Sequence, residues 1–375
     1  MIIRFLVVIT TCLALFSCKS PSSNPEEPDI AETVFISSDN VTLLAYDALS
    51  GTKKWVFTSE DYGASSGTRA TPTIDNGTVY VHGGFILYAI DSATGAKKWS
   101  YAMEDVSFSS PTVVNGTVYV GSGRWLYAID VATHTKKWAQ QLYDIAASPT
   151  VYKGIVYIST GFRDGSLYAI DAETGTKKWS IKLGTEIYSS PTLVNEVVYI
   201  TNMDGDLFAI DAITGVKKWE YKIGESHFSS PTVANGVVYV GTGDSRLLAI
   251  DASTGTKKWE FKAGAGFYSS PIVVDGILYI GSDLTEGKLY AIEVASGTKK
   301  WEFKVGTGIY SSPTVASGIV YIGGLDSNLF AVDAVTGVKK WDVTLEALKT
   351  AVYSSPCVVT KKGVVFHPGI SGDQQ

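Results

Sequence analysis

Eight copies of one short motif hold most of the side chains in this sequence that could do chemistry. Each copy has an acidic residue, a turn, two lysines and a tryptophan, as in "LYAIDAETGTKKW" at residues 167–179. The motif therefore represents either eight equivalent chemical sites or one structural joint that is used eight times. The tryptophans are Trp55, Trp99, Trp138, Trp179, Trp219, Trp259, Trp301 and Trp341. The copies closest to the pattern A-x-D-x-x-T-G-x-x-x-W have Asp91, Asp171, Asp211, Asp251 and Asp333.

Other residues give little indication of catalysis or metal binding. The four histidines occupy different positions of the repeat, which argues against a shared metal site; they are His82, His134, His227 and His367. No calcium loop, phosphate loop or Ser/His/Asp signature is present, and "DGD" at 204–206 is typical of a hairpin turn. Cys357 stands where other copies have Thr or Ile, which predicts a small buried strand residue and not a reactive thiol.

The N-terminal residues are predicted to lie outside the fold. Arg4 precedes an apolar stretch from Phe5 to Phe16, which has the length of a signal-peptide core and is too short to span a bilayer. "LFSC" at 15–18 resembles a bacterial lipobox, which implies cleavage before Cys18 and attachment of lipid to its thiol. The alternative is an ordinary secretory signal with an incidental cysteine.

These features predict a signal peptide at 1–17, a lipidated and flexible tether at 18–32, one folded domain at 33–370 and a disordered tail at 371–375. Lys19, in place of Asp, favours the outer membrane under enterobacterial sorting rules. The formal net charge of −6 argues against nucleic acid or an anionic membrane surface as a main partner. We expect a monomer in the cell envelope that is attached to the membrane through its lipid.

The spacing of the motif tryptophans, about 40 residues along the whole chain, indicates a repeat architecture. Each period contains four short β-type runs that are separated by Asn-Gly, Asp-Gly or Thr-Gly turns, so it reads as a four-stranded antiparallel meander. Inner runs such as "VVYVGT" at 237–242 are apolar on both faces, which small sheets achieve by packing against copies of themselves. The sequence therefore predicts an all-β, eight-bladed β-propeller.

The two ends of the chain are predicted to share one blade. The first repeat lacks an innermost strand, and "SSPCVVTKKGVVFHPG" at 354–369 lacks outer strands, so the C-terminal segment closes the ring. "VFIS" at 34–37 and "VVFH" at 364–367 both suit the second strand position, and the sequence does not choose between them.

In this geometry the motif is a joint and not an active site. Asp171 can accept backbone N–H bonds at the turn, Gly175 gives the turn its backbone freedom, and Trp179 can cover the seam between blades. Burial of one whole indole would contribute roughly 4–6 kcal/mol as an upper bound. The lysine pairs are interpreted as protection of the exposed blade edge; contact with a polyanion or with lipid headgroups is the alternative.

The motif resembles the tryptophan-docking repeat of the pyrroloquinoline-quinone (PQQ) propeller superfamily. Two branches of the superfamily differ in function. Resemblance to the quinoprotein dehydrogenases would imply oxidation with PQQ and Ca²⁺, but their adjacent cysteine pair and active-site insertions are missing here. Length, lipobox and blade number resemble the outer-membrane protein assembly lipoproteins of the BamB type, which implies a scaffold for the barrel-inserting machinery without cofactor. We expect a non-enzymatic scaffold that binds envelope proteins; a lipoprotein that binds a polysaccharide or an extracellular protein is the alternative.

Candidate binding residues lie in the loops that lead from one blade to the next. The residue before each inner strand start is usually aromatic, which predicts either a collar at the channel mouth or packing between blades. The candidate collar consists of Arg69, Phe108, Tyr188, Phe228, Tyr268, Tyr310 and Tyr353.

Overall fold

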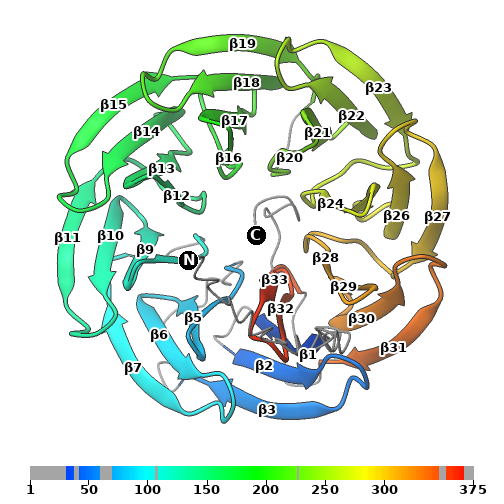
Figure 1. Cartoon of the computed structure of the whole chain (residues 1–375), viewed down its shortest axis with the longest axis horizontal. Helices are drawn as coiled ribbons and strands as arrows, with labels where there is room; N and C mark the ends of the chain where they lie inside the picture. Colours follow the sequence, from blue (N-terminus) through cyan, green and yellow to red (C-terminus); the bar gives the residue numbers. More distant parts are fainter. Residues whose placement is uncertain are drawn as a thin grey trace, which may run out of the picture.

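The computed structural model describes residues 31–37, 42–59, 70–105, 109–225, 228–345 and 352–366. These residues form 33 strands in eight antiparallel sheets, which are arranged around a central axis (Figure 1). The predicted eight-bladed propeller is confirmed. Blade 1 unites the two ends of the chain, and blades 2 to 8 follow in sequence order. Among the described residues there is no helix long and apolar enough to cross a bilayer.

Blades 2 to 8 have four strands each and blade 1 has five; we number the four positions common to all blades from the axis outward. The first strands are β32 (Cys357–Thr360) in blade 1, then β4 (Thr73–Asp75), β8 (Thr112–Val114), β12 (Thr150–Tyr152), β16 (Thr192–Val194), β20 (Thr232–Ala234), β24 (Ile272–Val274) and β28 (Thr314–Ala316). The second strands are β1 (Ala31–Ser37), β5 (Thr78–Gly83), β9 (Thr117–Ser122), β13 (Ile155–Ser159), β17 (Val197–Thr201), β21 (Val237–Gly241), β25 (Ile277–Gly281) and β29 (Ile319–Gly323).

The two outer positions complete each blade. The third strands are β2 (Thr42–Asp47), β6 (Ile86–Asp91), β10 (Trp125–Asp130), β14 (Ser166–Asp171), β18 (Asp206–Asp211), β22 (Arg246–Asp251), β26 (Lys288–Glu293) and β30 (Asn328–Asp333). The fourth, outermost strands are β3 (Lys53–Thr58), β7 (Lys97–Ala102), β11 (Lys136–Gln141), β15 (Lys177–Lys182), β19 (Lys217–Lys222), β23 (Lys257–Lys262), β27 (Lys299–Lys304) and β31 (Lys339–Thr344).

The strand order of blade 1 shows which of the two terminal segments, 34–37 or 364–367, takes the second position. Its sheet has the order β3-β2-β1-β32-β33, so β1 lies second and the C-terminal β32 lies inside it. β33 (Val365–Phe366) adds a short fifth strand on the axial side of β32. β1 begins at Ala31, two residues before the predicted domain start. The ring is thus closed by antiparallel pairing between the first and last parts of the chain, with Val34 opposite Val358.

The core lies between neighbouring blades. The second and third strands are buried on both faces, as the sequence predicted; every residue of β21 is buried. Each hydrophobic cluster combines side chains of two adjacent sheets. In one of them, Val240 of blade 6 packs in the same cluster as Leu207 of blade 5. Cys357 is fully buried on β32, in the structural position that its sequence context predicted.

The ring has two different faces. One face carries the turns between third and fourth strands, together with the hairpins between first and second strands; the backbone N–H of Ala172 on one such turn donates to Gly154 O on a hairpin. We call it the lysine face, because the eight lysine pairs, at residues 53–54, 97–98, 136–137, 177–178, 217–218, 257–258, 299–300 and 339–340, begin the outer strands there. The opposite face carries the loops between blades and the hairpins between second and third strands. We call it the collar face, because it carries the candidate collar residues.

Candidate interaction site

The motif aspartates are used inside their own turns. Asp171 accepts hydrogen bonds at Oδ1 from the backbone N–H groups of Glu173 (3.1 Å) and Thr174 (3.0 Å), and its Oδ2 pairs with Lys178 Nζ at 2.9 Å. The hydrogen bond from Lys178, followed by the one from the Thr174 backbone, lowers the pKa of Asp171 to about 2. Equivalent Asp–Lys pairs join Asp91 to Lys98, Asp211 to Lys218, Asp251 to Lys258 and Asp333 to Lys340. These carboxylates hold turns.

The motif tryptophans bridge adjacent blades. Trp179 Nε1 donates to the carbonyl oxygen of Ala212 in the next blade at 3.1 Å, and the hydroxyl of Tyr157 donates to the same oxygen at 3.0 Å. The indole lies against Gly215, where a Cβ atom would be only 2.8 Å from Trp179 Cδ2. Gly215 also has a φ of 74°, so glycine satisfies both the turn and the close approach.

The same joint recurs around the ring. The other indole N–H donors reach Ser92 from Trp55, Ala172 from Trp138, Ala252 from Trp219, Val294 from Trp259, Ala334 from Trp301 and Ala48 from Trp341. The Trp341 bond joins blade 8 to blade 1. Trp99 instead stacks on His134, which replaces the turn glycine, with 5.0 Å between ring centroids. All eight indoles stay partly exposed, so each contributes less than the full-burial bound.

A closed belt of hydroxyl groups surrounds the axis. The backbone N–H of Ser190 donates to Ser230 Oγ at 2.9 Å, and each blade repeats this bond to the next. The belt contains Thr71, Ser110, Ser148, Ser190, Ser230, Ser270, Ser312 and Ser355. Its last bond, from Ser355 N to Thr71 Oγ1 at 3.2 Å, closes the circle. Sequence reasoning missed this belt, although the repeated Ser-Ser-Pro was its signal.

Five of the seven candidate collar residues line the mouth of the central channel. Tyr188, Phe228, Tyr268, Tyr310 and Tyr353 form an unbroken row of ring contacts, with centroids 4.6 to 6.0 Å apart. They line a cavity of about 390 Å³ together with Ala146 and seven belt serines. The rings thus both pack between blades and face the channel. Arg69 and Phe108 of the predicted collar lie outside the described residues, as do Cys18, His227 and His367.

The cavity has a defined chemical character. Its described lining consists of aromatic rings, serine hydroxyls and one alanine, with neither a carboxylate nor a cationic side chain. A serine hydroxyl that accepts an N–H can still donate its own hydrogen, so the belt offers donors to the channel. Burial, with the nearby negative charge of Glu186, raises the pKa of Tyr188 to about 12, so its hydroxyl stays protonated at neutral pH.

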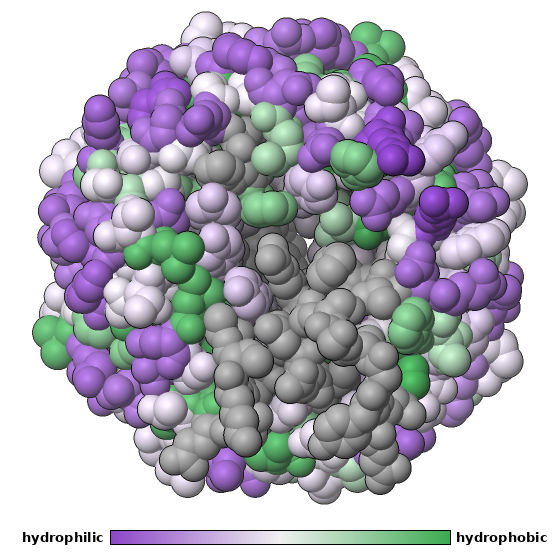
Figure 2. Space-filling view, turned by 180° about the vertical axis from the view of Figure 1, so that it is seen from behind, coloured by the Kyte–Doolittle hydropathy of each residue, from purple (hydrophilic) through white to green (hydrophobic). Residues whose placement is uncertain are grey.

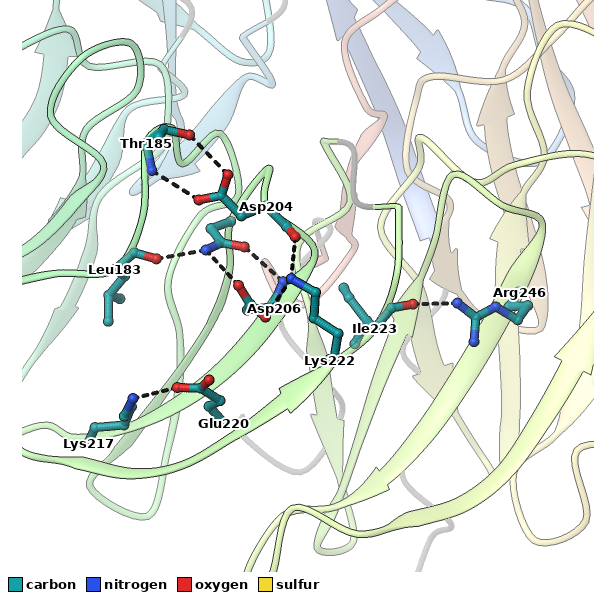
Figure 3. Close-up of polar contacts among 10 residues, drawn as sticks. Leu183, Thr185, Asp204, Asp206, Lys217, Glu220, Lys222, Ile223 and Arg246 are labelled. Carbon is teal, nitrogen blue, oxygen red and sulfur yellow. Dashed lines mark hydrogen bonds and ion pairs between the residues drawn. The ribbon is translucent and has the colours of Figure 1, made fainter.

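Carboxylates of the collar face are tied to neighbouring loops. Figure 3 shows Asp204, which accepts hydrogen bonds from the backbone N–H and the hydroxyl of Thr185 at 3.1 and 3.2 Å. Asp206, two residues on, pairs with Lys222 at 3.0 Å. The "DGD" stretch is therefore a hairpin turn whose two carboxylates fasten different neighbours. Among the described residues no group of three or more His, Cys, Asp or Glu side chains is placed to hold a metal ion.

One buried histidine was also missed by sequence reasoning. His82 is fully buried on β5, and neither ring nitrogen has a hydrogen-bond partner among the residues that the structure describes. It occupies the strand position where Gly121 and Thr201 direct their N–H groups to a serine, and blade 2 has Ala70 in place of that serine. Burial lowers the pKa of His82 to about 3, so the ring is neutral at physiological pH.

Comparison with known proteins places the chain in the PQQ-like class of β-propellers. The family model described as "Outer membrane protein assembly factor BamB" matches residues 16–181, 163–272 and 262–373. The chain belongs to this family. No curated protein matches the sequence.

Solved structures show the same fold in proteins of different function. BamB from Moraxella catarrhalis is 17% identical, with a TM-score of 0.66, and the match covers 80% of this chain and 96% of that chain. A europium-containing methanol dehydrogenase is 13% identical, with a TM-score of 0.66 and 80% of both chains covered. The computationally designed Ika8 protein is 16% identical, with a TM-score of 0.69, over 79% of this chain and 94% of that chain. At these identities the likeness concerns the fold alone.

The described cavity does not fit the cofactor of the dehydrogenase branch. PQQ carries several carboxylate groups, and Ca²⁺ takes six to eight oxygen ligands, carboxylates among them. The described lining supplies no cation that could pair with the carboxylates of PQQ and no carboxylate that could bind Ca²⁺. The channel chemistry instead suits an uncharged surface that combines apolar groups with hydrogen-bond acceptors.

Proposed function

We propose that this protein is a non-enzymatic, lipid-anchored scaffold of the bacterial cell envelope with a BamB-like role in outer-membrane protein assembly. Membership of the BamB family is the observation that carries the proposal. The chemistry of the described channel lining supports it, because that lining suits neither PQQ nor Ca²⁺. Attachment to the outer membrane through Cys18 is part of the proposal.

The collar face is the proposed binding surface for an envelope protein. Aromatic rings are enriched in protein interfaces because they bury a large area at little cost in side-chain entropy. Here five rings surround a cavity, so a loop or side chain of the partner can enter between them. Phe228 keeps 38% of its surface exposed even within the row, which leaves a ready contact for a partner.

Affinity isolation from solubilised membranes tests the role. We expect subunits of the barrel-assembly machinery to co-purify with the wild-type chain. The triple variant Tyr188→Ser, Phe228→Ser, Tyr268→Ser should lose them, while Tyr143→Ser should keep them. Tyr143 is a matched control, because it is 59% exposed on a loop of the same face but does not line the cavity.

Other outcomes would favour the alternatives. Capture of extracellular polymers or host proteins alone would indicate a surface lipoprotein, and protease shaving of intact cells would then remove the protein. Dye-linked substrate oxidation after addition of PQQ and Ca²⁺ would refute the non-enzymatic proposal. Anchoring is tested separately: Cys18→Ser should move the protein from the membrane fraction to the soluble fraction.

A further inference from the structure

The chain enters the propeller on the lysine face. In blade 1, Thr33 of β1 is paired with Asp47, the residue that begins the Thr-Gly-type turn of this blade. Lys54 Nζ contacts the same end of β1, donating to Glu32 O at 3.0 Å and to Thr33 Oγ1 at 2.8 Å. The segment that precedes Ala31 is therefore covalently joined to the ring at this face.

The lysines of this face differ between the two halves of the ring in whether they form ion pairs. In blades 5 to 8 the first lysine of each pair bonds a carboxylate three residues on, as Lys257 does with Glu260 at 2.9 Å. Lys217, Lys299 and Lys339 are paired in the same way with Glu220, Glu302 and Asp342. In blades 1 to 4 the corresponding position is Val56, Ser100, Ala139 or Ser180. Within the described residues, Lys53, Lys97, Lys136 and Lys177 accordingly make no ion pair.

Aliphatic side chains project from the same face. Leu49 lies in the turn beside the lysine pair of blade 1, Ile213 and Val216 in that of blade 5, and Val335 and Val338 in that of blade 8. All are at least about half exposed, and Val335 reaches 83%. A scattered exposed aliphatic residue is ordinary. Basic and exposed apolar side chains on one side of a molecule both favour contact with lipid headgroups.

The collar face has a different composition. Its loops and hairpins carry exposed carboxylates that include Glu104, Asp105 and Glu225, beside the lysines that end outer strands, and its exposed apolar residues include the aromatic Phe85, Tyr143 and Phe162. Figure 2 shows one face of the ring, with hydrophilic residues around most of the circumference and hydrophobic residues among them and nearer the centre. An anionic surface would therefore bind more strongly to the lysine face, which carries four lysines without ion pairs among the described residues, than to the collar face.

We propose that the lysine face lies against an anionic bilayer surface, with blades 1 to 4 as its strongest contact. Each lysine near such a surface strengthens binding by about fivefold at low ionic strength. A polybasic surface also supplies a second membrane signal beside a lipid chain. The collar face then points away from the bilayer. The inference goes beyond the proposed function, because it requires no protein partner and makes no use of the collar.

Vesicle flotation with the full chain tests the proposal. All proteins carry Cys18→Ser, so that no acyl chain contributes, and any contribution of the apolar N-terminal stretch is common to them. The probes are vesicles of phosphatidylcholine alone and vesicles with about one third phosphatidylglycerol. We expect tighter binding to the anionic vesicles and a steady loss of that difference as salt is raised.

Two quadruple variants locate the contact. Lys53→Gln, Lys97→Gln, Lys136→Gln and Lys177→Gln together should weaken binding to anionic vesicles by at least about tenfold, and by roughly several hundredfold if all four lysines contact the surface. The control changes Lys182, Lys222, Lys262 and Lys304 to Gln, which removes the same charge from the opposite ends of outer strands. It should weaken binding by about twofold at most, through net charge alone.

Three results would overturn the proposal: equal binding to both kinds of vesicle, equal loss in both variants, or no binding at low salt. Circular dichroism of each variant excludes unfolding as the cause. Because the vesicles contain no protein, these results do not bear on the assembly role, and a failed affinity isolation would leave the membrane contact intact.

Discussion

Two closed rings hold the propeller together, and they are built from different chemistry. The outer ring consists of indoles that span the seams between blades, with Trp179 on Ala212 as a typical joint. The inner ring is the hydroxyl belt, in which Ser190 N donates to Ser230 Oγ. Both rings are completed only by blade 1, through Trp341 to Ala48 outside and Ser355 to Thr71 inside.

The difference between the rings concerns how much surface each contact buries. An indole removes a large apolar area from water and also forms a hydrogen bond, whereas a serine contributes one hydrogen bond beside a channel that water can enter. The outer ring should therefore provide most of the seam stability. The inner ring should mainly hold the inner strands at fixed spacing, which sets the geometry of the collar above it.

The largest expected effect is the loss of one outer joint. Trp179→Ala should lower the free energy of unfolding by about 3–4 kcal/mol, because it removes a partly buried indole and leaves a cavity between blades. Trp179→Phe should cost about half as much, since a ring remains and Tyr157 still donates to Ala212 O. Urea unfolding, followed by circular dichroism, measures both. Equal, small losses would mean that the indoles are not the principal seam contact.

Two glycines allow the cost of crowding an indole to be distinguished from the cost of backbone strain. Gly175 and Gly154 have nearly equal φ angles, 72° and 74°. A Cβ at Gly175 would lie 2.7 Å from Trp138 Cδ2, while nothing lies within 4 Å of one at Gly154. We expect Gly154→Ala to cost about 1 kcal/mol from strain and Gly175→Ala about 2–3 kcal/mol from strain and overpacking. If thermal or urea unfolding gives the same value for both, the indole–glycine contact adds nothing to the joint.

As pH falls, the free energy of unfolding should first decrease because of His82 in blade 2, and only at lower pH because of the turn aspartates. The pKa of His82 is about 3 in the folded chain and about 6.5 when unfolded. A depressed histidine pKa means that the unfolded state binds the extra proton, so stability is full above pH 6.5 and falls as pH drops toward 3. The expected loss at pH 5 is about 2 kcal/mol.

His82→Thr supplies the control, because Thr201 occupies the equivalent position in blade 5. Urea unfolding at several pH values should show a flatter profile for this variant between pH 7 and 5, whatever its stability at neutral pH. The motif aspartates act in a lower window, since their pKa values are depressed and their contribution is lost as pH falls through those values. An unchanged slope for His82→Thr would assign the acid sensitivity elsewhere.

The smallest expected effect is at the belt. Ser230→Ala removes the acceptor of the Ser190 N–H and should cost about 1 kcal/mol, because channel water can replace the hydroxyl. Ser180→Ala on the exposed outer strand should stay within about 0.5 kcal/mol. If Ser230→Ala lowered the free energy of unfolding as much as Trp179→Ala, the inner ring would contribute at least as much to stability as the outer ring.

The repeat made much of this molecule predictable. Strand positions, turn residues and the closing role of the C-terminal segment follow from residue types that recur every forty or so positions. The choice between "VFIS" and "VVFH" was not predictable, because both suit a strand. β1 takes the second position because it pairs along its length with β2 of its own hairpin, whereas β33 pairs with β32 at only Val358–Phe366 and Val359–Val365.

The sequence by itself determined the number of blades, the joint at each seam and the surplus of lysine on the outer strands, because each of these depends on local patterns. Only the tertiary structure decided that the repeated serines close into one belt and that His82 is buried with no hydrogen-bond partner in the described part of the chain. It likewise decided that the chain enters on the lysine face. These features depend on contacts between residues about forty positions apart or at opposite ends of the chain, which exist only once the ring has closed.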